Sequence, residues 1–211
     1  MIDLDVFRSQ AGETLDARAD AFGHGLSLVA PAAVETRVRR IVVSDDRDAA
    51  VAREAGFAPA DVVVDRTGGG ADSAAYGLEE GGHPVLSLVG EVVALKRVPA
   101  GVGVSYGYTH RTTAPTTLAL VGLGYADGVP RLASNRARVR VGDELFPLVG
   151  RIAMDQLVLD VGDADLELGM DAVLFGGAAG DPSPQDWARW TEREPLALTA
   201  GLAPRVQRVA R

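Results

Sequence analysis

The chain has 211 residues, of which 47% are hydrophobic and 24% charged, and none is cysteine. It is globular in composition and long enough for one or two domains, and the lack of cysteine excludes disulfides and thiolate metal sites. The net charge of −8 argues against nucleic acid as a partner, and since the sequence shows no signal peptide and no apolar run of roughly 20 residues, we expect a cytoplasmic protein without membrane contact.

The first part of the chain has the alternating pattern of an α/β fold. Residues 40–43 predict a short strand, and a helix over about 46–55 follows, with Ser44 or Asp45 as its N-cap. Residues 61–65 predict a second strand, of the buried type. Because strands that alternate with helices are typical of parallel sheets, we expect a small parallel arrangement here.

A glycine-rich break follows over residues 66–73 and carries three consecutive glycines. A glycine run can cradle phosphate, but neither a dinucleotide-binding nor a P-loop spacing surrounds this one. We therefore interpret it as a boundary or deletion scar. It divides a predicted α/β domain over residues 1–80 from a second domain over residues 84–211.

The second domain has the pattern of an antiparallel β fold that ends in a helix. Short strands separated by turn signals are typical of a barrel or sandwich. Ser183 and Pro184 open the predicted helix as N-cap and first residue. The predicted strands are Leu86–Val98, Val102–Tyr108, Thr117–Gly122, a hairpin over 139–149, Leu157–Val161 and Ala172–Phe175.

Three glycine-bounded segments in this domain present polar side chains. They are VSYG around Tyr106, GYADG around Tyr125 and GRIAMDQ around Asp155. Taken alone, the tyrosines could equally anchor a core through satisfied hydroxyls, and an aspartate near glycine is an ordinary turn residue. Residue chemistry by itself leaves both interpretations open.

The order and wording of these segments resemble the C-terminal domain of alanine racemases. The resemblance covers about residues 84–211, and its tail WARWTEREPLALTAGLAPRVQRVAR belongs to it. By this resemblance Tyr106 is the family's tyrosine base, which works in the partner subunit's active site. Met154, Asp155 and Tyr125 lie where the family binds its substrate.

The N-terminus resembles the same family at its cofactor-lysine motif. The segment Arg18-Ala-Asp-Ala-Phe-Gly-His-Gly is similar to Lys-Ala-Asp-Ala-Tyr-Gly-His-Gly. In the family this lysine forms the Schiff base with pyridoxal 5'-phosphate and is one of two catalytic bases. Here Arg18 holds the lysine position, Phe22 the tyrosine position, and His24 falls in the cofactor region.

The family fold is a TIM barrel followed by a β domain, and this chain is too short for it. A TIM barrel takes at least about 200 residues, and only about 80 precede the β domain. We therefore expect an α+β fold with a truncated α/β remnant of two or three βα units and no closed barrel. The antiparallel β domain of the family follows it.

The resemblance also implies which chemistry is lost. A guanidinium is always protonated, so Arg18 is neither a base nor an amine that forms a stable aldimine. The only lysine, Lys96, matches a strand of the family's C-terminal domain and is not expected to replace it. We expect no bound cofactor and no metal site.

Three functional hypotheses follow. The first is a catalytically silent racemase relative with a binding, scaffolding or regulatory role, and therefore not an enzyme. The second is a residual pyridoxal-phosphate-dependent alanine racemase, an isomerase that supplies D-alanine for cell-wall precursors. The third is a remnant gene product without selected function. As partners we expect a second copy, joined through the β domain, or a full-length alanine racemase.

Overall fold

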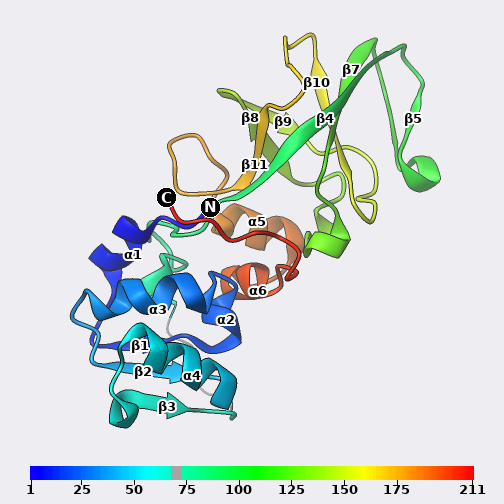
Figure 1. Ribbon diagram of the computed structural model, residues 1–211. Coiled ribbons are helices and arrows are strands. Elements are labelled where there is room, and N and C mark those ends of the chain that lie inside the picture. Colours follow the sequence, from blue (N-terminus) through cyan, green and yellow to red (C-terminus); the bar gives the residue numbers. More distant parts are fainter. Residues whose placement is uncertain (68–72) are drawn as a thin grey trace. The chain divides into compact units, whose positions relative to one another are not determined.

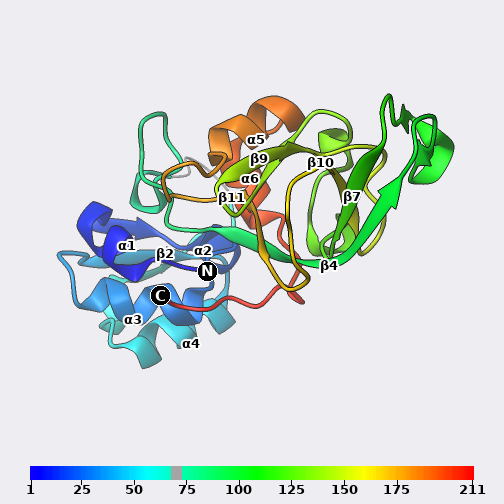
Figure 2. The ribbon, with the colours of Figure 1, turned by 90° about the horizontal axis from the view of Figure 1, so that it is seen from above.

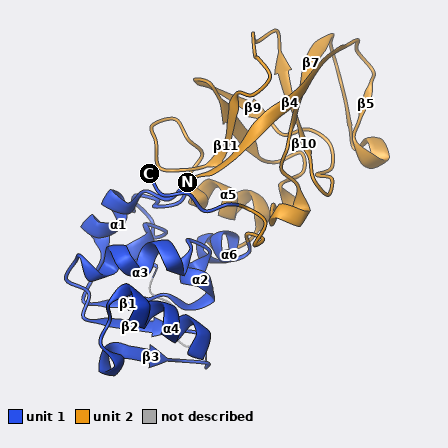
Figure 3. Ribbon diagram, in the orientation of Figure 1, with its two compact units in different colours: residues 1–86, 195–201, 207–211 blue, residues 87–194, 202–206 orange. Residues whose placement is uncertain are grey.

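The computed structural model describes residues 1–67 and 73–211, which form two compact units (Figure 3). Unit 1 contains residues 1–86, 195–201 and 207–211, and unit 2 contains residues 87–194 and 202–206. Most of the glycine-rich break lies outside the described residues. Both chain ends belong to unit 1, where Ile2 pairs with Ala210 in a parallel bridge.

Unit 1 is built on a parallel sheet of three strands in the order β1-β2-β3 (Figure 1). The strands are β1 (Thr14–Asp16), β2 (Arg40–Val43) and β3 (Val62–Val64). The sheet confirms the expected α/β remnant without a closed barrel. The helices of unit 1 are α1 (Leu4–Gln10), α2 (Arg18–Phe22), α3 (Leu26–Val34), α4 (Asp46–Ala55) and α6 (Pro195–Ala200), with 3₁₀ turns η1 (Pro59–Asp61) and η2 (Ala74–Tyr76).

The helix predicted over residues 46–55 is confirmed as α4. Asp45 is its N-cap, because the carboxylate accepts hydrogen bonds from the backbone N–H groups of Arg47 and Asp48, both at 2.9 Å. Ser44 is not the N-cap. Its Oγ instead accepts a hydrogen bond from the backbone N–H of Ala19 at 2.8 Å.

The strand predicted over residues 61–65 exists as β3, but it is not buried. Val63 is 38% exposed, and the flanking valines are half-buried. The reason is that β3 pairs only with β2 among the described strands and is therefore a sheet edge. A closed barrel would have placed a further strand there.

Unit 2 is a nearly closed antiparallel barrel, in the strand order β10-β7-β4-β11-β8-β9. A bridge between Leu148 and Leu159 links the end of β9 to β10. This confirms the expected antiparallel β domain. Figure 2 shows β4 and β7 running side by side. The strands are β4 (Leu88–Val98), β7 (Thr116–Val121), β8 (Arg138–Val141), β9 (Glu144–Pro147), β10 (Leu157–Gly162) and β11 (Asp171–Phe175).

The strand predicted over Val102–Tyr108 is wrong for most of its length. Only β5 (Gly103–Val104) is extended, and it pairs with β6 (His110–Arg111). A 3₁₀ turn, η3 (Tyr106–Tyr108), follows, because Ser105, Gly107 and Tyr108 have φ angles of 56°, 72° and 49°, which a strand cannot contain.

The remaining elements of unit 2 are short 3₁₀ turns and one helix. The turns are η4 (Tyr125–Asp127) and η5 (Arg131–Ala133), and the predicted helix is confirmed as α5 (Pro184–Thr191). Ser183 and Asp186 form its capping box. Within the described residues, no helix is long and apolar enough to cross a membrane.

Candidate functional site

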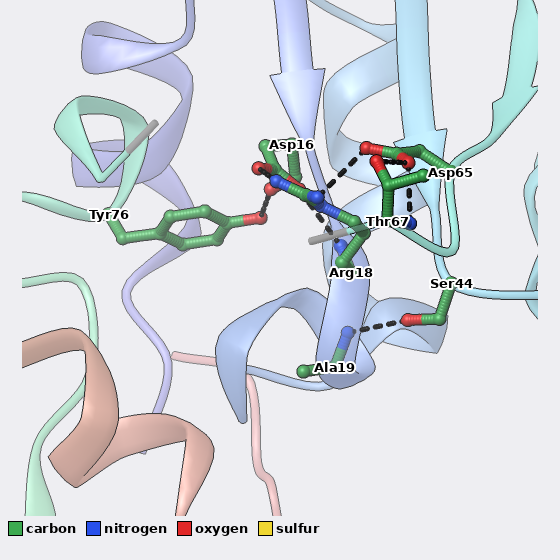
Figure 4. A network of polar contacts seen from close by, with 7 residues as sticks. All are labelled: Asp16, Arg18, Ala19, Ser44, Asp65, Thr67 and Tyr76. Carbon is green, nitrogen blue, oxygen red and sulfur yellow. Dashed lines mark hydrogen bonds and ion pairs between the residues drawn. The ribbon is translucent and has the colours of Figure 1, made fainter. Parts of the chain in front are cut away.

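The candidate site of unit 1 lies where its parallel strands end, at the edge that carries ligands in open α/β sheets. Asp16 is the last residue of β1 and Asp65 follows β3 directly, while Ser44 follows β2. Arg18 comes two residues after β1 and points between the two carboxylates (Figure 4).

The Arg18 guanidinium is bound by both carboxylates. Its Nε and Nη2 donate to the two oxygens of Asp16 at 2.9 and 2.6 Å, and its Nη1 donates to Asp65 Oδ2 at 2.9 Å. Arg18 is only 8% exposed. The hydrogen bonds with Asp16 are the main cause that raises the pKa of Arg18, and the charge of Asp65 adds to them.

Further hydrogen bonds fix these partners. Thr67 donates to Asp65 Oδ1 through its N–H at 2.8 Å and its hydroxyl at 2.6 Å, and these bonds lower the pKa of Asp65. The buried Tyr76 hydroxyl donates to the Asp16 carbonyl at 2.7 Å. The three charged groups, Arg18, Asp16 and Asp65, sum to a net charge of −1.

The residues after Arg18 form a left-handed turn. Ala19, Asp20, Ala21 and Phe22 have φ angles between 48° and 57°, a conformation that costs L-residues roughly 1–2 kcal/mol each. Gly23 continues the turn at φ 80°, and a Cβ there would lie 1.9 Å from the carbonyl oxygen of Thr199 in α6. The strained turn is therefore held by packing within unit 1.

His24 and Phe22 lie in an aromatic cluster around Tyr76. Their ring centroids are 4.5 and 5.7 Å from that of Tyr76. His24 is fully buried, and its Nδ1 lies 2.9 Å from the carbonyl of Ala21. A carbonyl only accepts, so Nδ1 carries the hydrogen, while Nε2 has no hydrogen-bond partner among the described residues. Burial lowers the pKa of His24 to about 4.

In unit 2 the structure brings Tyr125, Met154 and Asp155 together. The N–H of Tyr125 donates to the Ala153 carbonyl at 3.0 Å, and the N–H of Ala126 donates to the Met154 carbonyl at 2.9 Å. The preceding glycine allows this approach, because a Cβ on Gly124 would lie 2.2 Å from the Met154 oxygen.

Asp155 belongs to a second charge network, centred on Arg205. The Arg205 guanidinium donates to Asp127 Oδ1 at 2.7 Å and to Asp155 Oδ1 at 2.6 Å. These bonds, the one with Asp127 first, raise the pKa of Arg205. Sequence reasoning missed Arg205, because an arginine 50 residues from Asp155 carries no local signal of the pairing.

Tyr106 is 71% exposed on the 3₁₀ turn η3. The turn is anchored by Ser105, whose hydroxyl donates to the Arg151 carbonyl at 2.5 Å. Tyr106 borders an open hollow of about 500 Å³ that Ala153 and Gln156 also line. The structure therefore places Tyr106 beside the segment that carries Met154 and Asp155.

Comparison with known proteins gives one family. The family model "Alanine racemase, C-terminal domain" matches residues 85–210. The alanine racemase of Thermobifida fusca is 38% identical over 201 residues, which are 92% of this chain and 51% of the relative. The alanine racemase of Beutenbergia cavernae is 47% identical over 133 residues, which are 62% of this chain and 35% of the relative. The chain thus spans about half or less of these relatives.

Solved structures show the same fold. The alanine racemase from Streptomyces coelicolor A3(2) matches with a TM-score of 0.82 at 23% identity, over 99% of this chain and 96% of that one. The racemase from Bacillus anthracis with bound L-Ala-P matches with a TM-score of 0.84 at 18% identity. In sequence, 128 aligned residues make up only 33% of the Streptomyces coelicolor racemase. The structural match reaches across 96% of the Streptomyces coelicolor chain, which is much longer than this one. A long internal part of that chain therefore has no counterpart here.

The buried His24 predicts a specific pH dependence of stability. In the unfolded chain His24 takes up a proton near pH 6.5, whereas in the folded chain it does so only near pH 4. Its contribution to stability is therefore complete above pH 6.5 and is lost as the pH falls toward 4, by about 3 kcal/mol. His24→Asn keeps a donor toward Ala21 and removes the titration.

Urea denaturation of both proteins between pH 4.5 and 7.5 measures this effect. The free energy of unfolding should fall more steeply with acid in the wild type than in His24→Asn. Parallel pH profiles would contradict the assignment of a neutral, buried imidazole.

Proposed function

The chain belongs to the alanine racemase family, and from this premise we propose that it is a catalytically degenerate member that acts by binding. The observation that carries the proposal is the Arg18 guanidinium held between Asp16 and Asp65. The position at which the family resemblance puts a cofactor lysine is occupied by a group that is always charged and already has its partners.

The residues at this edge do not fit pyridoxal 5'-phosphate. An internal aldimine requires a free amine, and the only lysine of the chain, Lys96, lies on β4 in unit 2. The phosphate requires cationic or N–H donors, but the trio of Arg18, Asp16 and Asp65 carries a net negative charge. No step of a reaction is therefore assigned to this cofactor.

The proton chemistry of racemisation is incomplete as well. Removing an α-proton on one face and returning it on the other takes two bases on opposite sides of the substrate. Tyr106 is available as one of them, since it is exposed beside an open hollow. The second position is Arg18, which cannot accept a proton.

Unit 2 carries exposed apolar side chains that could bind a partner. Tyr106 and Tyr108 are exposed and line one hollow with Ala153, the chain neighbour of the exposed Met154. Exposed apolar groups on one surface mark interaction sites. We propose that a second copy pairs through this surface, since closed two-fold pairing is the commonest form of self-association. A full-length alanine racemase is the alternative partner, to which Tyr106 would be presented.

The cofactor proposal predicts that pyridoxal phosphate leaves no reducible adduct on Arg18→Lys or on the wild type. In Arg18→Lys the new ammonium sits between Asp16 and Asp65, which favour its charged form. The measurement is an absorbance scan followed by borohydride reduction and peptide mass spectrometry, with racemisation of L-alanine assayed in parallel.

Lys96→Arg serves as the control, because it removes the only native side-chain amine while retaining the charge. An aldimine band in the wild type that borohydride abolishes and that maps to Lys96, or measurable racemisation by Arg18→Lys, would refute the proposed loss of catalysis.

The pairing proposal predicts a concentration-dependent dimer in sedimentation velocity. The double variant Tyr106→Asp/Met154→Asp should shift the chain to monomer, because it places charge within the proposed surface. Val63→Asp, which adds charge at an exposed valine of unit 1, is the matched control and should leave the dimer unchanged. A monomer at every concentration, alone and with a full-length homologue, would rule out both partners.

A further inference from the structure

A row of apolar side chains lies on the outer face of the strands β4, β7 and β10. In register, Ala94 pairs with Leu120 and Leu120 with Val158. Residues directly opposite in a sheet face the same side, and residues two apart along a strand do so as well. The neighbouring row on this face therefore begins with Lys96 on β4 and continues with Leu118 on β7.

This face is hollowed rather than flat. A groove of about 280 Å³ lies between it and the segment 102–105, which contains β5. Leu118, Leu120 and Val158 form its floor, and Val102 and Val104 line it from the other side. The groove adjoins the larger hollow beside Tyr106, because Ser105, Leu120 and Val158 border both.

Among the residues that the structure describes, Lys96 is the only charged one that lines the groove. Within residues 1–67 and 73–211 it forms no ion pair, although acidic residues outnumber basic ones in the chain by 29 to 21. Its neighbour Arg97 does, with Asp163 at 2.6 Å. Asp160 ends the row beyond Leu118 and accepts hydrogen bonds from Thr116 and Gly162.

An apolar groove with one ammonium at its wall has the chemistry of a ligand site. Small-molecule sites are mostly apolar and hold few polar groups, which fix the orientation of the ligand. The lysine stem lies along apolar surface while its ammonium reaches water. The ligand that complements both features has an aliphatic chain and a single negative charge.

We propose that this groove binds a small aliphatic carboxylate. Its chain lies over Leu118, Leu120 and Val158, and its carboxylate pairs with the Lys96 ammonium. A volume of about 280 Å³ lies just below the roughly 300–1,000 Å³ of ligand pockets, so a short chain is expected. The inference rests on the proposal that the chain acts by binding and adds a small-molecule ligand to the protein partners proposed above.

The single lysine makes the test direct. Reductive methylation with ¹³C-formaldehyde labels only Lys96 and the N-terminal amine, and dimethyllysine keeps its charge. Octanoate is the probe, with 1-octanol and octylammonium as ligands of equal chain length. Octanoate should shift the Lys96 signal saturably and leave the N-terminal signal unmoved, whereas octylammonium should have no effect.

Three variants separate the contribution of the Lys96 charge to octanoate binding from that of the apolar groove. By calorimetry, Lys96→Met should bind octanoate roughly three- to fivefold more weakly, the factor of a solvent-accessible ion pair, and should bind 1-octanol unchanged. Arg97→Met removes the same charge next to Lys96 and should bind octanoate as the wild type does. Ala94→Glu places a carboxylate in the groove and should abolish octanoate binding.

Equal affinity for octanoate and 1-octanol in the wild type, or no shift of the Lys96 signal, would overturn the inference. So would a Lys96 signal that moves with protein concentration alone and not with octanoate, because a second copy would then occupy the groove. The absorbance scan with pyridoxal phosphate tests the proposed function separately. An aldimine on Lys96 would refute the proposed loss of catalysis. If octanoate does not bind and no aldimine forms, only the proposed ligand site in the groove is refuted.

Discussion

The contact between Arg18 and the carboxylates of Asp16 and Asp65 is the interaction on which the proposed loss of catalysis rests. It connects the end of β1 to the residue after β3, which are the two outer strands among the three described strands of this sheet. The planar guanidinium takes both oxygens of Asp16 in a bidentate pair and still reaches Asp65, a geometry that a lysine ammonium does not reproduce. Arg18 offsets one of the two negative charges at this edge, and under the proposed function it stands where cofactor chemistry would need an amine.

The left-handed turn after Arg18 is a second feature of this edge, and it is strained. Four consecutive non-glycine residues keep positive φ angles, and Gly23 still fits against α6 with no room for a side chain. Unit 2 is similar, since Gly124 still allows the close approach of Met154. Glycine thus allows a close backbone approach in both units.

Sequence reasoning found the elements whose signals are local. The cap Ser183, the choice between Ser44 and Asp45 as the other cap, and the hairpin around Gly142 follow from short-range patterns. The elements α4, α5, β8 and β9 appear where those patterns place them. It failed where distant residues decide the outcome. β3 is exposed because it pairs only with β2 among the described strands, and the pairing of Asp155 with Arg205 joins distant parts of the chain. Of the acids around Arg18, only Asp65 had a weak signal, since it directly follows the apolar strand Val62–Val64, whereas Asp16 ends a strand with a single apolar residue, Leu15.

The proposed function depends on a strong interaction between Arg18 and its carboxylate partners. A double-mutant cycle with Arg18→Met and Asp16→Asn, followed by urea denaturation, measures the interaction free energy between these two side chains directly. Both side chains are about nine-tenths buried, so their coupling should exceed that of a surface pair and reach on the order of 2 kcal/mol. Each single variant should then lose nearly as much stability as the double variant. Strictly additive losses would show that the two side chains act independently and would contradict the account.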